Sequence, residues 1–287
     1  MSSLSVNQRA AKKTFQSDMA RKRLDSLMVE KGLSSSREKA KISILMGKVF
    51  VNGQKVTKPS MTFLDEDMIE FHGEGQKYVS RGGYKLEKAM EAFSIELEGR
   101  VCADIGSSTG GFTDCMLQNG AKRVFAVDVG YGQLACKLRS DERVTVMERV
   151  NARYLTPEDF EEAPSFASID VSFISLKLIV PALAGCGIRE IAALIKPQFE
   201  AGREEVGKKG IIRDRDVHMK VIRNVQEEML EAGYSVTDIT YSPIKGQDGN
   251  IEFLGHFVLD GERQRVIEEK IRETVEEAHS STARYVL

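Results

Sequence analysis

A loop rich in glycine and hydroxyl side chains is the first feature of the sequence that could bind a ligand. It reads Asp104-Ile105-Gly106-Ser107-Ser108-Thr109-Gly110-Gly111-Phe112, follows a β-prone run and opens a helical stretch. Small residues let the backbone approach a ligand closely at the carboxyl end of a strand. The spacing is G-x-x-x-G-G and not the G-x-G-x-x-G of dinucleotide folds, so the loop fits a pyrophosphate poorly.

An aspartate ends the next β-prone run. Asp128 follows Val124–Val127 and lies 24 residues after Asp104, one strand-helix-strand unit later. A carboxylate at this place can accept two hydrogen bonds from a ribose diol. Together the loop and Asp128 predict a site for an adenosine-containing cofactor. The alternative is a glycine-rich turn and a strand-end aspartate of an unrelated α/β protein.

The elements that position these residues follow from an alternation of β-prone runs with helical stretches. The runs are Val101–Ile105, Val124–Val127, Val144–Met147, Phe166–Ile169, Ile191–Ile195, Val236–Tyr241 and Phe253–Leu259. Such alternation predicts an α/β domain with a mostly parallel sheet covered by helices. Ligands bind at the carboxyl ends of the strands in such sheets, so we expect the site at that edge.

The first 60 residues differ from the rest of the chain in charge. They hold 13 Lys+Arg against 4 Asp+Glu, a net of +9, whereas the other 227 residues hold 28 against 39, a net of −11. A basic end on an acidic body indicates a polyanion-binding module joined to a second domain. A solvated charged face is the alternative.

Within this basic segment, the pattern predicts two helices followed by a hairpin. Leu24, Leu27 and Met28 recur at helical spacing. Ser34–Ser36 offer N-caps for a second helix. Asn52-Gly53 between short β-prone stretches is a strong hairpin signal.

The same segment resembles the S4 RNA-binding domain, a small α+β domain. The resemblance rests on Arg23-Leu24-Asp25, Ser36-Arg37 and Gly47-Lys48-Val49-Phe50-Val51-Asn52-Gly53. It implies binding to structured RNA by shape and phosphate contacts, in agreement with the charge, because cations gain affinity by releasing counterions. The residues expected to contact RNA are Arg21, Arg23, Arg37, Lys39, Lys41, Lys48, Lys55 and, beyond this segment, Arg81.

The larger part of the chain resembles the class I methyltransferases that use S-adenosylmethionine (SAM). More narrowly it is similar to the TlyA-type branch, in which an S4 domain is fused to an FtsJ-like ribose methyltransferase. The matching stretches are Ser80–Leu86, Asp104–Phe112, Asp128–Leu134, Asp170–Leu176 and Lys196–Glu200. The resemblance implies a Rossmann-like, seven-stranded, mostly parallel sheet, with SAM as cofactor.

This resemblance also implies a cofactor site residue by residue. The loop Asp104–Gly111 is expected to hold the methionine end of SAM, Asp128 the ribose and the Asn151 region the adenine. Val129, Asp170 and Phe112 complete the expected cofactor contacts.

FtsJ-like enzymes use a Lys-Asp-Lys-Glu tetrad, which this chain matches with Lys85, Asp170, Lys196 and Glu252. Ribose 2′-O-methylation requires an aligned hydroxyl and removal of its proton. The resemblance makes Lys196 the expected proton acceptor, with Lys85 helping to hold the substrate oxygen and the two acids orienting the lysines. Each residue alone has an ordinary alternative as a surface charge, and Glu252 is also open to interpretation as an edge charge.

The resemblance further implies a cytidine ribose of ribosomal RNA as substrate, and ribosomal RNA or ribosomal subunits as partners. One alternative is a non-catalytic RNA-binding or ribosome-assembly factor, which the complete tetrad opposes. A second is a pore-forming or haemolytic protein, which the lack of a membrane-length apolar run opposes. A third is a pseudouridine synthase that uses Asp25, but Asp25 lies inside a predicted helix and the SAM-type loop would have no role.

The cysteines and the N-terminus bear on the cellular setting. Cys102, Cys115, Cys136 and Cys186 lie far apart, without a CxxC pair or a histidine at ligand spacing. We therefore expect buried thiols and neither a metal site nor a disulfide framework. The polar stretch Met1–Ala20 predicts a cytoplasmic protein. The oligomeric state stays open.

The expected organisation has five parts. They are a flexible lead-in over residues 1–18, an S4-like domain over 19–71, a linker over 72–79, an FtsJ-like methyltransferase domain over 80–260, and a C-terminal helix and tail over 261–287.

Overall fold

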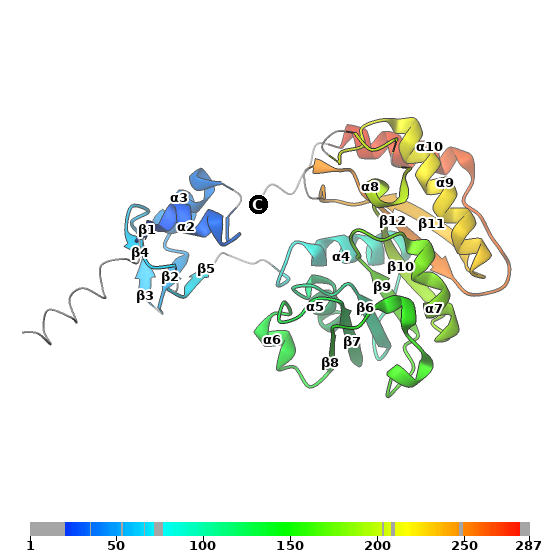
Figure 1. Ribbon diagram of the computed structural model, residues 1–287, viewed down its shortest axis with the longest axis horizontal. Helices are drawn as coiled ribbons and strands as arrows, with labels where there is room; N and C mark the ends of the chain where they lie inside the picture. The colour runs from blue at the N-terminus through cyan, green and yellow to red at the C-terminus, as the bar shows by residue number, and fades with distance from the viewer. Residues whose placement is uncertain are drawn as a thin grey trace, which may run out of the picture. The chain divides into compact units, whose positions relative to one another are not determined.

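The computed structural model describes residues 21–34, 36–52, 54–65, 67–71, 77–202, 204–207, 210–246 and 249–281. The chain divides into two compact units, Met1–Gln76 and Lys77–Leu287 (Figure 1). The lead-in expected over residues 1–18 lies outside the described residues.

The N-terminal unit packs two helices on small antiparallel sheets. Its elements are β1 (Lys22–Arg23), α2 (Leu24–Glu30), α3 (Arg37–Leu45), β2 (Val49–Val51), β3 (Gln54–Val56), β4 (Thr62–Phe63) and β5 (Ile69–Phe71). The strand orders are β3-β2-β5 and β1-β4. Leu24 and Met28 of α2 are buried with Ile44 of α3 and Val49 of β2, as the helical spacing predicts. Ser36 caps α3 by accepting a hydrogen bond from the Lys39 amide.

The C-terminal unit is built on a seven-stranded sheet. Its strands are β6 (Val101–Ile105), β7 (Arg123–Asp128), β8 (Val144–Glu148), β9 (Phe166–Ile169), β10 (Glu190–Ile195), β11 (Ser235–Tyr241) and β12 (Phe253–Val258). In the described residues the order is β11-β12-β10-β9-β6-β7-β8. β12 runs antiparallel to both of its neighbours, whereas β6 to β10 pair in parallel. The expected mostly parallel, seven-stranded α/β fold is confirmed.

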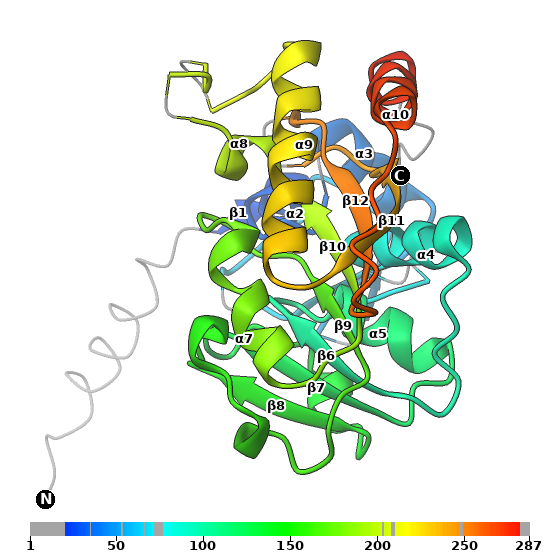
Figure 2. The same cartoon turned by 90° about the vertical axis from the view of Figure 1, so that its right-hand side faces the viewer.

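Helices cover both faces of this sheet (Figure 2). The helices are α4 (Gly82–Phe93), α5 (Gly111–Gln118), α6 (Cys136–Arg139), α7 (Val180–Gly185), α8 (Pro197–Glu200), α9 (Arg215–Glu231) and α10 (Glu268–Ser280), with 3₁₀ turns at Ala152–Tyr154, Pro157–Asp159 and Leu176–Leu178. α7 and α9 pack on one face, while α4 and α5 pack on the other. α10 packs against α9 and β11. No helix in the described part of the chain has the length and apolarity needed to cross a membrane.

The junction before α4 differs from the expected linker over 72–79. Residues 77–79 pack within the C-terminal unit, where the side chain of Tyr78 is buried. The ring lies against Gly83, at which a Cβ atom would come within 2.2 Å of Tyr78 Cγ. An aromatic ring buried in this way belongs to a core and not to a linker. Residues 72–76 lie outside the described residues.

Three of the cysteines have the expected buried thiols and one does not. Cys102, Cys115 and Cys186 are buried, whereas Cys136 is exposed. Cys136 begins α6, a single helical turn that buries only Leu138. The expectation was wrong here because a turn this short covers one side chain and leaves the others in solvent.

Candidate active site

The residues that were expected to bind the cofactor or to act in catalysis lie at one edge of the seven-stranded sheet. Gly106 follows β6, Asp128 ends β7, Asp170 follows β9 and Lys196 follows β10. Glu252 directly precedes β12. Because β12 is antiparallel to β10, its first residue, Phe253, pairs with the last residue of β10, and Glu252 reaches the same edge as the parallel strand ends.

The four residues of the expected tetrad lie in contact with one another. Lys196 Nζ lies 2.6 Å from Asp170 Oδ1, and Lys85 Nζ lies 3.8 Å from Asp170 Oδ2. Lys85 Nζ also donates a hydrogen bond to Glu252 Oε2 at 2.7 Å. The Lys85 and Lys196 side chains are only 12% and 9% exposed, so both cations are paired largely out of solvent. A buried cation is expected only where acids compensate it, and here Asp170 serves both lysines.

Two contacts of the tetrad escaped sequence reasoning. Lys196 Nζ donates a hydrogen bond to Ser172 Oγ at 3.1 Å. Gly246 lies against Glu252, since a Cβ atom at Gly246 would come within 2.2 Å of Glu252 Oε1. Ser172 belongs to the stretch Asp170–Leu176, which carries part of the family resemblance, so the sequence did hold a signal for it. Gly246 lies in the β11–β12 connection, and nothing in the sequence indicates that it meets Glu252.

The glycine loop has the backbone geometry that its composition predicts. Gly106 and Gly110 adopt φ angles of +86° and +94°, which side chains rarely permit. A Cβ atom at Gly106 would also come within 2.5 Å of the Asp170 carbonyl oxygen. The loop therefore lies close against the segment that carries Asp170.

Asp128 is tied to the loop by backbone hydrogen bonds. Its Oδ2 accepts from the Ser108 amide at 2.8 Å, and its Oδ1 accepts from the Gly130 amide at 2.7 Å. Each carboxylate oxygen has a further lone pair for a ligand hydroxyl. Asn151 lies near the same strand end, because the preceding amide, Val150, donates to the Asp128 carbonyl at 3.0 Å. Val129 is exposed beside it.

Asp104 faces inward, although it was expected among the cofactor contacts. Its carboxylate is fully buried and accepts hydrogen bonds from Thr113, through the amide and the hydroxyl, and from the Ser168 hydroxyl. Burial raises the pKa of Asp104 to about 6, against the hydrogen bonds that favour its charge. Asp104 thus ties β6, α5 and β9 together beneath the loop.

An open cleft of about 380 Å³ runs along this edge, a volume within the usual range for small-ligand sites. Expected residues that line it are Arg81, Lys85, Gly106, Ser107, Ser108, Thr109, Gly111, Phe112, Asp170, Lys196 and Glu252. Lining residues that were not expected are Ser80, Gly82, Ser172, Phe173, Gln198, Phe199, Ile244, Lys245 and Gly246. The other expected cofactor residues, Asp104, Gly110, Asp128, Val129 and Asn151, lie outside this lining.

The cleft wall and the neighbouring end of β7 have groups suited to an adenosyl amino acid. Gln198 has a buried carboxamide oxygen with no hydrogen-bond partner in the described residues, which a ligand donor would satisfy. Asp128 offers carboxylate lone pairs to a diol. The close approach at Gly106 leaves the loop backbone accessible beside Asp170. These residues fit SAM.

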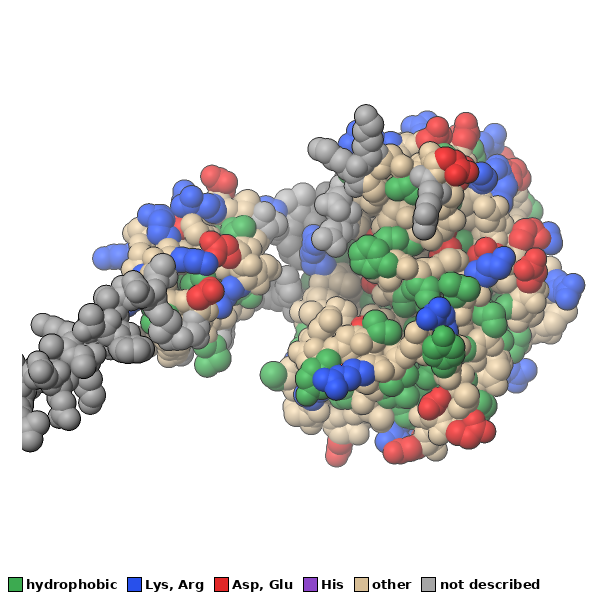
Figure 3. Space-filling view, in the orientation of Figure 1, with side chains coloured by type: hydrophobic (Ala, Val, Ile, Leu, Met, Phe, Trp, Pro, Cys, Tyr) green, Lys and Arg blue, Asp and Glu red, His purple; other side chains and the backbone are tan. Residues whose placement is uncertain are grey.

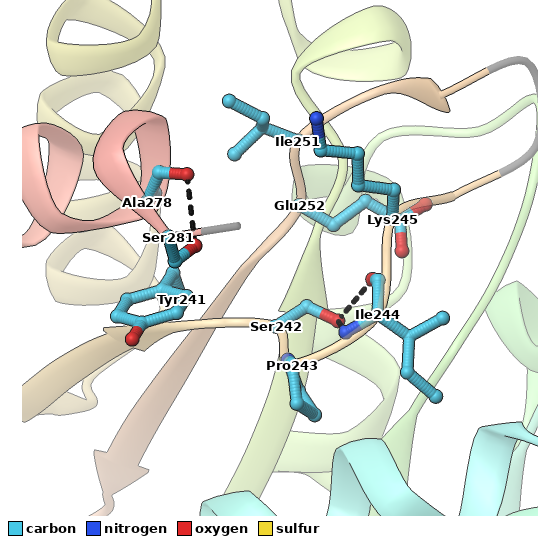
Figure 4. A pocket seen from close by; sticks show the side chains of 9 residues that line it. All are labelled: Tyr241, Ser242, Pro243, Ile244, Lys245, Ile251, Glu252, Ala278 and Ser281. Atoms are coloured by element: carbon cyan, nitrogen blue, oxygen red, sulfur yellow. Dashed lines mark hydrogen bonds between the residues drawn. The ribbon is translucent and has the colours of Figure 1, made fainter. Parts of the chain in front are cut away.

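A much smaller cavity shares Ile244, Lys245 and Glu252 with the cleft (Figure 4). Its volume of about 20 Å³ is enough for roughly one water molecule and not for a substrate. Ser242 Oγ donates a hydrogen bond to the Ile244 carbonyl oxygen at 2.6 Å, which holds the turn before Lys245.

The residues expected to bind RNA fall in both units. Arg21, Arg23, Arg37, Lys39, Lys41, Lys48 and Lys55 belong to the N-terminal unit, and Lys and Arg side chains lie over its helical part in Figure 3. Arg81 belongs to the C-terminal unit, where it precedes α4 and lines the cleft. The Arg21 guanidinium donates to the Thr62 carbonyl oxygen, so part of its hydrogen-bonding capacity serves the fold.

Comparisons with family models and with known proteins agree on one family. Residues 78–258 match the FtsJ-like methyltransferases and residues 22–69 match the S4 domain. The chain is 53% identical over 268 residues to YqxC of Bacillus subtilis (strain 168), covering 91% of this chain and 95% of that one. It is 43% identical over 239 residues to the "16S/23S rRNA (cytidine-2'-O)-methyltransferase TlyA" of Mycobacterium tuberculosis (strain ATCC 25618 / H37Rv), covering 82% and 89%.

A solved structure from Streptococcus thermophilus is similar over both parts. It is 49% identical, with a TM-score of 0.75, and the match covers 91% of this chain and 96% of that one. The family match and the relatives therefore agree with the arrangement of the cleft and of the N-terminal unit. The chain belongs to the FtsJ-like methyltransferases that carry an S4 domain, the family that includes TlyA.

Proposed function

We propose that this SAM-dependent methyltransferase methylates a ribose 2′-hydroxyl of ribosomal RNA, at cytidine, with Lys196 as the proton acceptor. The nucleotide and the position come from the printed name of the TlyA relative, which acts on cytidine 2′-O in 16S and 23S rRNA. Because ribosomal RNA or ribosomal subunits are the proposed substrate, the proposed location is the cytoplasm.

The observation that carries the proposal is the contact of two lysines with one aspartate in the wall of the cleft. Lys196 Nζ and Lys85 Nζ reach different oxygens of Asp170, at 2.6 Å and 3.8 Å. A single buried lysine beside an acid is an ordinary ion pair. Two lysines that share an acid, with a second acid on one of them, form a more specific arrangement and support a role in holding and deprotonating one substrate oxygen.

The chain's own residues have separate roles in this proposal. SAM, when bound, supplies an electrophilic methyl group. Lys196 Nζ, as the neutral amine, takes the hydroxyl proton of the substrate while Asp170 and Ser172 fix its position. Lys85 Nζ, held by Glu252, donates a hydrogen bond to the substrate oxygen. Most of the acceleration then comes from alignment, with proton removal adding about 10²–10⁴-fold.

The experiment that tests the proposal is methyl transfer from radiolabelled SAM. Unmodified small subunits, large subunits and naked ribosomal RNA serve as separate substrates, and the labelled nucleoside is identified after digestion. Lys196→Ala is compared with Lys122→Ala, because Lys122 is 57% exposed and forms an ion pair with Glu162 away from the cleft lining. Labelled 2′-O-methylcytidine with wild type and Lys122→Ala, lost with Lys196→Ala, is the expected result.

Other results would change the conclusion. Label on a base or on another nucleoside would overturn the substrate assignment. Full SAM binding without label on any RNA would favour a different RNA substrate or a missing partner, whereas no SAM binding would favour a non-catalytic RNA-binding or ribosome-assembly factor. Retained transfer by Lys196→Ala would remove Lys196 as the proton acceptor.

A further inference from the structure

A buried carboxylate in the N-terminal unit holds two exposed arginines. The Asp25 side chain is fully buried, whereas those of Arg23 and Arg37 are 44% and 51% exposed. Arg23 donates from Nε to Oδ1 at 3.0 Å and from Nη2 to Oδ2 at 2.8 Å. Arg37 Nη2 lies 3.4 Å from Oδ2 and 3.5 Å from Oδ1. The carboxylate is thus the common anchor of both side chains.

The backbone fixes where this anchor lies. Asp25 is in the first turn of α2, and Arg37 is the first residue of α3. The start of α2 is held to the 59–61 segment, because the Leu24 amide donates to the Met61 carbonyl oxygen and the Asp25 amide to that of Pro59. The Arg23 guanidinium lowers the pKa of Asp25 to about 2, so the carboxylate is charged at neutral pH. The anchor is therefore held in place through its backbone and is anionic at neutral pH.

The arginines keep hydrogen-bonding capacity on their outer side. A guanidinium has five N–H donors. Arg23 directs two of them to Asp25 through Nε and Nη2, and Arg37 approaches Asp25 only through Nη2. The other N–H groups of these half-exposed side chains can donate hydrogen bonds to an anion that approaches from solvent. An arginine already fixed in one rotamer loses less conformational entropy on binding than a free one.

We propose that Asp25 is a positioning residue that presents Arg23 and Arg37 as a preformed pair for two phosphate oxygens of the RNA backbone. The inference rests on the proposed function, which supplies RNA as the ligand. Arg is the side chain suited to such a pair, because its planar fork matches phosphate oxygens bidentately. Asp25 itself does not touch the RNA and acts only through the two guanidinium groups.

The sign of one substitution separates positioning from charge. Asp25→Asn removes a negative charge from a surface that binds a polyanion, so electrostatics alone predicts tighter binding. Positioning predicts the reverse, because both arginines lose their anchor. We expect the dissociation constant for unmodified ribosomal RNA to rise roughly fivefold or more, since two side chains must then be ordered on binding. The KM for RNA should rise equally while kcat and SAM affinity stay unchanged.

Two further variants control for the change in charge and for folding. Asp65→Asn makes the same charge change at a side chain that is 70% exposed and lies 4.0 Å from Lys22, and it should bind RNA as tightly as wild type or tighter. Asp25→Asn should weaken RNA binding by a smaller factor in an Arg37→Ala background, because one of the two arginines that Asp25 positions is already absent. Unfolding of the unit by Asp25→Asn would instead weaken binding by the same factor in both backgrounds.

Each outcome has one meaning. Equal or tighter RNA binding by Asp25→Asn, or a fall in kcat with KM unchanged, would overturn the positioning role and leave the proposed methylation intact. An equal loss in both backgrounds would also overturn it. If the wild-type chain itself failed to bind ribosomal RNA, the proposed function would fail first.

Discussion

The two units use the same device, an aspartate between two cations, with opposite exposure. In the N-terminal unit the acid, Asp25, is buried and its arginines reach solvent. In the C-terminal unit the acid, Asp170, is 21% exposed, while Lys85 and Lys196 are more deeply buried. Because arginine stays protonated and lysine can lose its proton, the first arrangement suits binding and the second suits proton transfer.

The choice of cation and its exposure therefore distinguish the two proposed roles, whereas the ion pairs by themselves do not. A surface arginine held in one rotamer binds an anion more readily but performs no chemistry. A buried lysine beside an aspartate is accessible only to groups that enter the cleft, and little of its side chain is in contact with solvent. Exchanging lysine and arginine between the two arrangements tests most directly whether the type of cation decides the role.

The largest effect is expected from Lys196→Arg. The charge is kept, but a guanidinium does not release its proton, so the proposed acceptor is lost. Methyl transfer should fall by about 10²–10⁴-fold. Single-turnover transfer to ribosomal RNA measures the chemical step, and calorimetry measures whether SAM binding is retained. Activity within a few-fold of wild type would mean that Lys196 supplies only charge.

The next effect concerns the backbone that holds Asp170. Gly106→Ala places a methyl group within 2.5 Å of the Asp170 carbonyl oxygen at a φ of +86°. Gly132→Ala is the matched control, since Gly132 has a φ of +71° and no neighbour within 4 Å of a Cβ. SAM affinity should fall at least about tenfold for Gly106→Ala, because its methyl group would overlap the Asp170 carbonyl oxygen in addition to straining the backbone by about 1–3 kcal/mol. Gly132→Ala has the positive φ without the overlap and should change SAM affinity little. Equal losses in both variants would attribute the effect to backbone strain alone.

A smaller effect is expected from the converse exchange, Arg23→Lys. An ammonium keeps the charge but cannot hold both Asp25 oxygens while offering donors to a phosphate. The KM for RNA should rise roughly threefold with kcat unchanged, which is near the lower end of the contribution of one ordinary hydrogen bond, about 0.5–1.5 kcal/mol. Arg265→Lys, whose guanidinium pairs with Glu227 in the other unit, is the control and should leave KM alone. A change in kcat for Arg23→Lys would contradict the separation between binding and chemistry.

The smallest effect is a contrast in pH dependence between two buried aspartates. The pKa of Asp25 is lowered to about 2 by Arg23, so the stability that it confers is present above pH 4 and is lost as pH falls towards 2. The pKa of Asp104 is raised to about 6 by burial, so ionisation weakens the fold as pH rises from 4 through 6. Relative to wild type, Asp104→Asn should gain stability over that rise, and Asp25→Asn should lose stability as pH rises from 2 to 5.

Thermal unfolding of the three proteins across pH 2–7 measures this contrast. A pKa difference of one unit corresponds to about 1.4 kcal/mol, so the shifts in unfolding temperature amount to a few degrees. Slopes of the same sign for the two variants would mean that the two carboxylates have similar surroundings, against the hydrogen bonds seen here.

Much of the fold could be predicted because the information is local. The β-prone runs mark each strand of the sheet to within a residue or so, and Asp170 and Lys196 directly follow two of those runs. Parallel strands bring such positions to one edge, so this part of the candidate site followed from sequence order. The helices of the N-terminal unit followed from the spacing of Leu24 and Met28 in the same way.

What could not be predicted depends on contacts between distant segments. Glu252 was expected in the tetrad from the family resemblance alone, and its place in the sequence also allowed an edge charge. In the structure β12 lies between β10 and β11, and the Glu252 side chain is 3% exposed beside Lys85. Asp104 resembled a cofactor contact, and only the positions of Thr113 and Ser168 turn it inward. The role of Asp25 as an anchor depends on Arg37, which is twelve residues away on another helix.

The place of β12 in the sheet has a consequence for the order in which the protein matures. β12 is the last strand of the sheet in the chain, and β11 pairs only with it among the described strands. A growing chain that ends before residue 250 therefore has neither a partner for β11 nor Glu252 beside Lys85. The N-terminal unit closes on contacts within its own residues and folds earlier in synthesis. During its own translation the protein therefore completes the surface proposed to bind RNA first and the edge proposed to carry catalysis last.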